Sequence, residues 1–407
     1  MNILLINHYA GSPSLGMEYR PYFMAKEWQK HGHNILIVAA SHSHVRSKQF
    51  NMKENFEKHN IEGVNYLVLN SPAYEGNTFK RLVNIMTFVW RLSKYKEMIV
   101  SEFKPDVVIA SSTYPFDIYP AKKITNISGA KLIFEVHDLW PLSPMELGGY
   151  SRWHPFIISM QRAENYAYRY ADKVISILPN TLEYMVKHGL QPEKFVHVPN
   201  GATIEQWDIS REIPDVVSKL INMLKKQDKI LIGYAGSHGL SNALDSLLDA
   251  MKILEKENVD LLMIGQGPEK EKLVQRTKML KLQNVHFIPS INRTLIPSLL
   301  DKLDILYIGL RKQPVFQFGI SPNKLIDYMM AGKPIIQAIK AGNDPVSEAG
   351  CGISVEPENP VDIAIAVRRL ISLSAQTLKE MGENGKKYCM INHDYKVISQ
   401  KFLKSLV

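Results

Sequence analysis

Short apolar runs alternate along this chain with longer stretches in which apolar residues recur every three or four positions. Continuous apolar runs are typical of parallel strands buried on both faces, and the stretches between them are typical of the helices that cover such a sheet. The first half therefore predicts a doubly wound α/β domain. Its runs are Ile3–Ile6, Ile35–Ala39, Tyr66–Leu69, Val107–Ala110, Leu132–Val136, Val174–Leu178 and Phe195–Val198.

The alternation breaks near residues 200–228, where the sequence turns polar and rich in lysine, and then resumes. A chain of 407 residues also exceeds the size at which a single hydrophobic core keeps growing. We therefore predict two similar α/β domains joined near this break. The runs of the second half are Ile230–Tyr234, Leu261–Gly265, Val285–Pro289, Ile305–Gly309, Pro334–Gln337 and Gly352–Val355.

Basic residues outnumber acidic ones by 49 to 40, and the net charge of +9 favours anionic partners such as nucleotides, diphosphates and lipid headgroups. We expect no nucleic acid partner. Two cysteines are too few for a disulfide framework and fit a reducing compartment. The chain starts without a signal-peptide pattern, and no run reaches about 18 apolar residues. We expect a cytoplasmic protein that can rest on the inner face of the cytoplasmic membrane.

The segment GISPNKLIDYMMAGKP is the most informative part of the sequence. Ser321 is a good helix cap, Pro322 suits the first helical position and Gly332 is expected to end the helix. The free backbone N–H groups at such a start attract an anion, and Lys324 adds a full positive charge there. A diphosphate fits this site, and Asp327 on the same helix face can accept hydrogen bonds from the hydroxyls of a ribose. The alternative is an ordinary capped helix with a solvated Lys–Asp pair.

This segment resembles the donor-binding motif of family-4 (GT4) glycosyltransferases, in which two glutamates separated by seven residues precede a turn and a proline. Asp327 matches the second glutamate, whose family role is to hold the ribose. Gly319 stands where the family has the first glutamate, so the resemblance implies that contact with the donor sugar passes to Ser321, Asn323 or a neighbour. The form SPNKLxDYMxAGKP is similar to the WbuB-like fucosamine transferases of O-antigen assembly.

Further elements follow in the family's order. The resemblance implies that glycine-rich turns after two strands and the backbone of a third strand end contact the donor, although each element alone is also an ordinary βα unit. Because no Arg or Lys occurs between residues 234 and 245, we expect Lys324 and His238 to carry the charge that neutralises the diphosphate. These donor-binding positions are Ser237, His238, Gly239, Gly265, Gly267, Pro268, Phe287 and Ile288.

In the first half, His137 and Asp138 follow a buried strand, where a histidine can transfer a proton or bind a sugar hydroxyl. The resemblance implies a catalytic role for His137 beside the donor sugar. It also implies that Gly16 approaches the donor phosphate or acceptor, with Glu18, Arg20 and Asp138 on the acceptor side. The alternatives are a structural His–Asp pair and a solvated Glu18–Arg20 pair.

The resemblance implies a GT-B fold, with two Rossmann-like domains facing a central cleft. Residues 1–203 would bind the acceptor, residues 204–391 the nucleotide sugar, and a helix at about 392–407, from Tyr395 to Leu406, would cross back to the first domain. It implies a retaining transfer, in which the leaving diphosphate helps to take the acceptor proton. The donor would be a UDP-sugar, N-acetylated as in the fucosamine and N-acetylhexosamine transferases. The acceptor would be an undecaprenyl-diphosphate-linked or oligosaccharide precursor of O-antigen or capsule.

Residues 80–104 combine six basic residues with Phe88 and Trp90, a composition that suits either a membrane-surface helix or a helix covering the sheet with a solvated basic face. Neither an Asp-x-Asp pair nor a Cys/His cluster occurs, so we expect no metal and no cofactor besides the donor substrate. Two other functions remain open from the sequence. One is a UDP-sugar 2-epimerase of the same fold, which needs no acceptor, and the other is a non-catalytic protein that binds nucleotide sugars.

Overall fold

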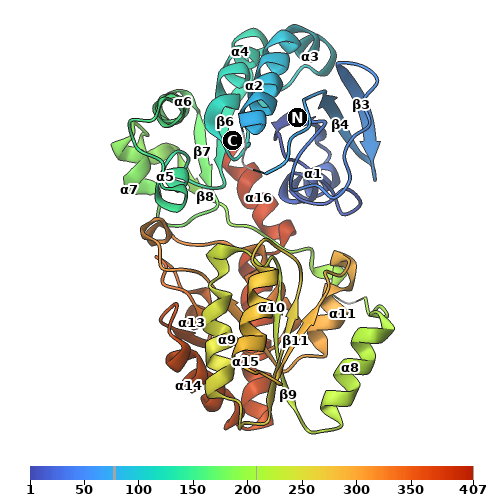
Figure 1. The fold of residues 1–407 in the computed structure, drawn as a ribbon. Helices are drawn as coiled ribbons and strands as arrows, with labels where there is room; N and C mark the ends of the chain where they lie inside the picture. Colours follow the sequence, from blue (N-terminus) through green and yellow to red (C-terminus); the bar gives the residue numbers. More distant parts are fainter. Residues whose placement is uncertain (77–78, 208, 407) are drawn as a thin grey trace. The chain divides into compact units, whose positions relative to one another are not determined.

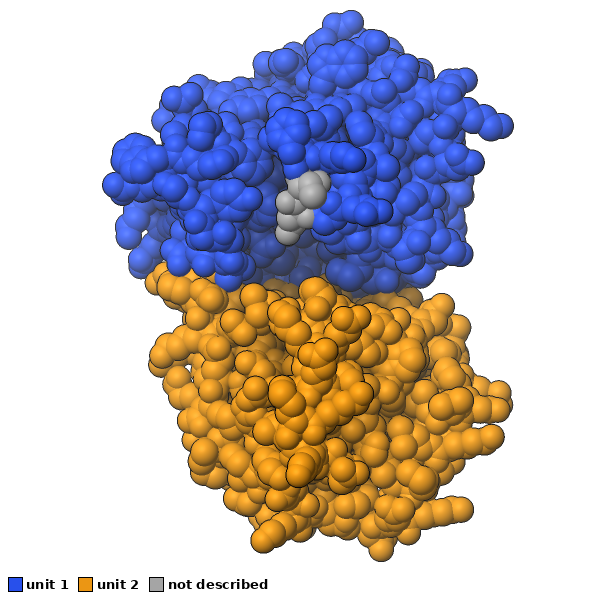
Figure 2. Space-filling view, in the orientation of Figure 1, with its two compact units in different colours: residues 1–200, 395–407 blue, residues 201–394 orange. Residues whose placement is uncertain are grey.

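A computed structural model describes residues 1–76, 79–207 and 209–406 of the chain. The chain forms two compact units, each with its own sheet and core, which are coloured separately in Figure 2. Unit 1 comprises Met1–Asn200 and Tyr395–Val407, and unit 2 comprises Gly201–Asp394. None of the helices in these described ranges is long and apolar enough to cross a membrane.

Unit 1 contains an eight-stranded sheet in the order β3-β4-β2-β1-β5-β6-β7-β8. Neighbouring strands are parallel except for β3, which is antiparallel to β4. The apolar runs of the first half all form strands, as predicted. The sequence FEKHNI of β3 was not predicted because an edge strand with one exposed face carries polar residues. The strands are β1 (Asn2–Ile6), β2 (Asn34–Ala40), β3 (Phe56–Ile61), β4 (Val64–Leu69), β5 (Val107–Ala110), β6 (Lys131–Val136), β7 (Lys173–Ser176) and β8 (Phe195–His197).

The last helix of the chain, α16 (Tyr395–Leu406), packs on the first, α1 (Arg20–Lys30), and it begins and ends at the residues expected from the sequence. The indole of Trp28 donates to the Ser399 carbonyl at 3.3 Å, and its ring centroid lies 5.0 Å from that of Phe402. Figure 1 shows α2, α3 and α4 gathered elsewhere on unit 1. The other helices are α2 (Phe79–Lys94), α3 (Lys96–Phe103), α4 (Ile118–Ser128), α5 (Leu142–Gly148), α6 (Pro155–Tyr170) and α7 (Leu182–Lys187).

The prediction of one basic helix over residues 80–104 is wrong, because the structure contains two helices there. Tyr95 stands between α2 and α3 with φ −93° and ψ 9°, outside the helical region. The basic residues are thus divided between two helix axes.

Unit 2 contains an all-parallel, six-stranded sheet in the order β11-β10-β9-β12-β13-β14. One core cluster joins the sheet to α8, α11, α12 and α15, and another joins it to α9, α10 and α14. The strands are β9 (Ile230–Ala235), β10 (Val259–Ile264), β11 (Val285–Ile288), β12 (Ile305–Gly309), β13 (Ile335–Ala338) and β14 (Gly352–Val355). The helices are α8 (Asp215–Lys225), α9 (Leu244–Ile253), α10 (Lys270–Met279), α11 (Ile296–Asp301), α12 (Asn323–Ala331), α13 (Pro345–Ala349), α14 (Pro360–Ile371) and α15 (Ala375–Asn392).

The strand order of each sheet reverses beside its first strand. In unit 1, β1 lies between β2 and β5, and in unit 2, β9 lies between β10 and β12. Loops diverge at such a switch point and leave a crevice outside the carboxyl ends of the strands, where α/β proteins bind their ligands. The loops after β1, β5 and β6 in unit 1, and after β9 and β10 in unit 2, are therefore the places to look for a site.

One testable consequence concerns α15, which crosses the end of α12. A Cβ atom added at Gly382 would lie 1.9 Å from the Gly332 carbonyl oxygen. Gly382→Ala should therefore force the two helices apart and lower the free energy of unfolding by about 1–3 kcal/mol, offset in part by the better helix propensity of alanine. Urea unfolding of unit 2 measures the change. The neighbouring Glu383→Ala is the control, and equal midpoints for both variants would contradict the close contact.

Candidate functional site

In unit 2, two glycine-bearing loops interlock at the carboxyl ends of β9 and β10. A Cβ atom at Gly265 would lie 2.0 Å from the Gly236 carbonyl oxygen, and one at Gly267 would lie 2.5 Å from the His238 carbonyl oxygen. The His238 N–H donates to the Gln266 carbonyl at 2.8 Å. Only glycine fits at positions 265 and 267. Because the two loops are in contact there, the predicted segments 237–239 and 265–268 form one continuous surface.

The ammonium of Lys324 lies against the first of these loops. It donates to the Tyr234 hydroxyl at 2.8 Å and to Asn242 Oδ1 at 3.2 Å, and it lies 4.0 Å from the centroid of the Tyr234 ring. A Cβ atom at Gly236 would lie 2.6 Å from Lys324 Cε, so the lysine occupies the space that this glycine leaves. Burial lowers the pKa of Lys324 to about 7. An anion bound here would raise that pKa and hold the charged form.

The start of α12 differs from the prediction by one residue. Pro322 precedes the helix in an extended conformation, with φ −76° and ψ 128°, and Asn323 is the first helical residue. The capping position belongs to Pro322, whose side chain makes no capping hydrogen bond, and not to Ser321 as expected, because Ser321 lies one position earlier. Gly332 ends the helix at φ 65°, as predicted. The Tyr328 hydroxyl accepts from the Ala235 N–H at 2.8 Å and so fixes α12 to the end of β9.

Asp327 is held by Arg293, a residue that the sequence did not single out. The guanidinium donates to both carboxylate oxygens, at 3.1 and 3.3 Å. Burial raises the pKa of Asp327, and the charge and hydrogen bonds of Arg293 oppose that rise. Lys324 and Asp327 therefore bind different partners, and the alternative of a solvated Lys–Asp pair is wrong. Arg293 lies in a short 3₁₀ turn after β11. The local sequence does not predict its contact with Asp327, because the two residues are 34 positions apart.

His238 does not carry the charge that was expected of it. The side chain is fully buried, and neither ring nitrogen has a hydrogen-bond partner among the residues that the structure describes. Burial, together with the charges of Lys270 and Lys324, lowers its pKa to about 4, so the ring is neutral near pH 7. Lys270 instead brings a second cation to the loops, where it donates to the Gly265 carbonyl at 2.8 Å.

Strand β11 contributes the remaining predicted positions of unit 2. The Ile288 carbonyl accepts from the Gly265 N–H at 3.1 Å, and the Phe287 ring lies 6.1 Å from the His238 ring. The end of β11 thus adjoins both glycine-bearing loops.

In unit 1, His137 belongs to a buried network at the carboxyl ends of β5 and β6. Glu135 Oε2 accepts from the Ser111 hydroxyl at 2.6 Å and lies 3.4 Å from His137 Nε2, which is 3.0 Å from Ser111 Oγ. Burial acts to lower the pKa of His137, but the hydrogen bond and charge of Glu135, with the charge of Glu18, raise it above its ordinary value. His137 is thereby oriented through Nε2.

The buried side chain of Arg20 holds Glu135 of this network in place. It is fully buried, and its guanidinium donates to Glu135 Oε1 at 3.0 Å, to the Pro199 carbonyl at 2.6 Å and to the Val198 carbonyl at 3.1 Å. The expectation that Arg20 faces an acceptor is therefore wrong, as is the alternative of a solvated pair with Glu18. A charge this deep in the protein must be fully paired, and these groups pair it.

Glu18 and Asp138 lie near His137. The charge of Glu18 acts on the pKa of both His137 and Asp138, and burial raises the pKa of Asp138 to about 6. Gly11 and Gly16, separated in sequence, meet in the loop after β1, since a Cβ atom at Gly11 would lie 2.0 Å from the Gly16 carbonyl oxygen. Gly16 also needs its φ of 102°, which few other residues adopt. Glu18, His137 and Asp138 thus come together, with Arg20 buried behind Glu135, whereas Gly16 shapes the loop after β1.

Family models match most of the chain. The model described as Glycosyltransferase Family 4 matches residues 16–206, and the model described as Glycosyl transferases group 1 matches residues 219–388. Within the part of the chain that the structure describes, no group of three His, Cys, Asp or Glu residues is placed to hold a metal ion.

Relatives are similar over long stretches. WcaI of Escherichia coli K12, a glycosyl transferase assigned to colanic acid biosynthesis, is 23% identical over 361 residues, which are 85% of this chain and 86% of WcaI. TuaH of Bacillus subtilis 168, assigned to teichuronic acid biosynthesis, is 24% identical over 47% of this chain and 46% of its own. The crystal structure of Anabaena Alr3699/HepE with UDP and glucose superimposes with a TM-score of 0.69 at 17% identity, covering 100% of this chain and 99% of that one.

The network around His137 generates a prediction. Glu135→Gln removes the charge that raises the pKa of His137, so that pKa should fall in the variant, while Glu18→Gln should lower it by a smaller amount. Histidine NMR titration measures the shift, with His137→Asn to assign the resonance. Glu183→Gln, an exposed change on α7, is the control. An unchanged His137 pKa in Glu135→Gln would show that the carboxylate does not tune the imidazole.

Proposed function

Because this chain belongs to glycosyltransferase family 4 and has the GT-B fold, we propose that it transfers a sugar from a UDP-sugar to an acceptor in the synthesis of a bacterial surface polysaccharide. The assignments of WcaI to colanic acid biosynthesis and of TuaH to teichuronic acid biosynthesis, together with the UDP in the HepE structure, support this. The observation that carries the proposal is Lys324 held against the glycine loop after β9.

The residues of unit 2 suit a nucleoside diphosphate. Lys324 and Lys270 place positive charge beside the glycine loops, which suits the binding of a phosphate. Asp327, held in place by hydrogen bonds from Arg293, would accept hydrogen bonds from the ribose hydroxyls. Asn323 and Ser321 stand at the start of α12, where they would contact the donor sugar, which we propose is N-acetylated.

The proposed chemistry is a retaining transfer. The bond between the anomeric carbon and the diphosphate oxygen breaks, the acceptor oxygen attacks from the same face, and its proton passes to the leaving diphosphate. Lys324 would stabilise the charge that develops on the diphosphate, a form of catalysis by preorganised charge. His137, fixed through Nε2, would bind the sugar or the reacting centre with its other nitrogen.

The acceptor is proposed to be lipid-linked, because unit 1 exposes an apolar face on α2. Phe79, Val83, Met86 and Trp90 follow one another at helical spacing, and Phe79 and Trp90 are 76% and 58% exposed. Lys94 lies 5.4 Å from the centroid of the Trp90 ring. Aromatic side chains flanked by cations bind the interface of an anionic bilayer, so the enzyme would work at the inner face of the cytoplasmic membrane.

The defining experiment mixes the protein with UDP-N-acetylglucosamine and an undecaprenyl-diphosphate-linked sugar. UDP should appear only when both are present, and NMR of the product should show the anomeric configuration of the donor. Formation of an epimer without acceptor would identify a 2-epimerase instead. Tight UDP binding without turnover on a panel of acceptors would identify a binding protein.

The state of Lys324 predicts the pH dependence of UDP binding. In the free protein its pKa is about 7, so above that pH a proton must be taken up when the diphosphate binds. The affinity should fall by up to roughly tenfold per pH unit above pH 7, and calorimetry in buffers of different ionisation enthalpy should detect the uptake. Lys324→Gln should bind weakly and without this slope, whereas the exposed Lys278→Gln should behave as wild type. Wild-type affinity in Lys324→Gln would refute the diphosphate site.

We also predict transfer without a divalent metal, because helix N–H groups and the lysines beside the glycine loops would neutralise the diphosphate. Activity should survive dialysis against EDTA. Complete loss that magnesium alone restores would overturn this.

A further inference from the structure

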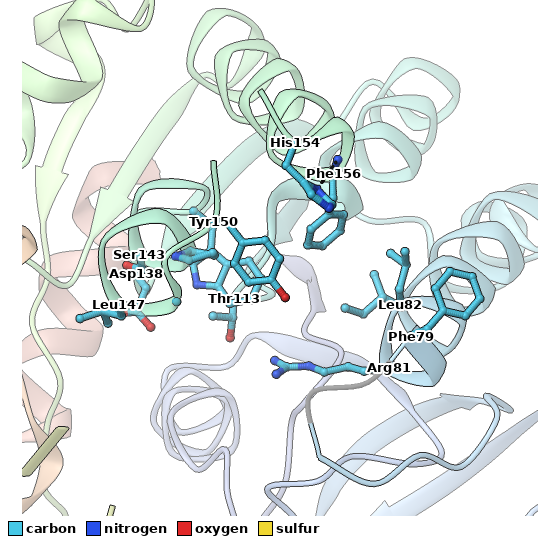
Figure 3. A pocket seen from close by; sticks show the side chains of 14 residues that line it. Phe79, Arg81, Leu82, Thr113, Asp138, Ser143, Leu147, Tyr150, His154 and Phe156 are labelled. Atoms are coloured by element: carbon cyan, nitrogen blue, oxygen red, sulfur yellow. Dashed lines mark hydrogen bonds between the residues drawn. The ribbon is translucent and has the colours of Figure 1, made fainter. Parts of the chain in front are cut away.

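Unit 1 contains a cavity of about 570 Å³ that no proposed step yet uses. It is an open cavity lined by α2, the segments after β5 and β6, α5 and the start of α6 (Figure 3). Its size is that of sites for drug-sized ligands. Much of the wall is apolar, including Phe79, Leu82, Ile85, Trp140, Leu147 and Phe156.

Arg81 places a guanidinium in the wall of this apolar cavity. It donates to the Tyr9 hydroxyl at 3.2 Å, and its Cζ lies 5.7 Å from the centroid of the Tyr9 ring and 5.9 Å from that of the Trp140 ring. In Figure 3 its side chain extends from α2 into the space between the two sides of the cavity. A planar guanidinium held between aromatic rings is suited to phosphate, which it binds through paired N–H groups.

The cavity joins two other features of unit 1. On one side its lining includes Asp138, the residue after His137. On the other side is Phe79, the first residue of the exposed face of α2, whereas Leu147, which is 50% exposed, lies on the same side as Asp138 (Figure 3). A ligand in the cavity would thus extend from the site around His137 to an apolar surface.

We propose that this cavity binds the part of the acceptor where a hydrocarbon chain meets its phosphate, with Arg81 on the phosphate and the walls of α2 and α5 around the chain. The inference rests on the proposed transfer to a lipid-linked acceptor and names the place where the lipid phosphate is held. Aliphatic walls alone would suit any apolar ligand, and a cation alone any phosphate. Their combination selects a lipid phosphate, of either isoprenoid or straight-chain type.

The test measures binding to the full chain by calorimetry, without any donor. The probes are farnesyl phosphate and dodecyl phosphate below their aggregation concentrations, inorganic phosphate, and octyl glucoside as an uncharged chain. At least one lipid phosphate should bind ten or more times more tightly than the two partial probes. A preference between farnesyl and dodecyl phosphate identifies the chain type. Equal affinity for all four probes would overturn the proposal.

Two pairs of variants locate the binding. Leu147→Glu should weaken lipid phosphate binding at least tenfold, whereas Ile127→Glu, at a similarly exposed apolar residue outside the cavity, should not. Arg81→Gln should abolish the advantage of the lipid phosphate over octyl glucoside, whereas Arg152→Gln should preserve it. Tyr150→Ala replaces Leu147→Glu if that variant does not fold. Unchanged binding in the cavity variants would refute the cavity.

These outcomes separate the two proposals. If the cavity variants bind lipid phosphate like wild type while UDP still binds and turns over, the cavity assignment fails and the transfer stands. If the lipid phosphate binds as predicted but UDP does not, the proposed transfer fails and the cavity stands.

Discussion

The buried ion pair between Arg20 and Glu135 is the interaction on which the site of unit 1 depends. It joins the start of α1 to the end of β6, and the same guanidinium holds the carbonyls of residues 198 and 199. Burial alone would raise the pKa of Glu135, but Arg20, His137 and Ser111 hold it well below its usual range. Removal of either partner would leave a buried charge unpaired, at a cost of about 3–5 kcal/mol. His137 therefore owes its orientation and its raised pKa to Glu135, which Arg20 holds in place.

In unit 2, by contrast, the buried charge of Lys324 contacts neutral groups, and no carboxylate, among the described residues. Lys324 is surrounded by neutral partners, a tyrosine ring and hydroxyl and an amide oxygen, and its pKa falls because nothing nearby compensates for burial. A carboxylate beside it would have stabilised the free protein and competed with an anionic ligand. The one nearby carboxylate on α12, that of Asp327, is instead engaged by Arg293. An anion bound at the glycine loops would therefore stabilise the charge of Lys324, whose hydrogen-bond and ring contacts in unit 2 are with neutral groups.

The sequence could predict what depends on local pattern. Apolar runs marked the buried strands, Gly332 marked the end of α12, and the glycines after β9 and β10 marked positions that only glycine fits. It could not predict pairings set by tertiary structure. The sequence suggested a solvated Arg20, but the fold pairs its side chain with Glu135. The ion pair of Arg293 with Asp327 could not be predicted, because it depends on how the turn after β11 lies against α12. The charge of His238 was misjudged because burial, which no sequence pattern reports, decides the pKa of an imidazole.

The loop before α12 explains how the chain departs from the family motif at Gly319. This residue has a φ of 96°, which a glutamate would adopt only under strain. The next residue, Ile320, is held on both sides of its backbone by the Asn343 side chain, which accepts from its N–H at 2.7 Å and donates to its carbonyl at 3.1 Å. Asn343, a residue after β13, thus fixes the backbone of this loop. A glutamate at position 319 would strain the loop at this φ. The proposed contact with the donor sugar would then depend on the backbone path that Asn343 imposes on residues 319–321.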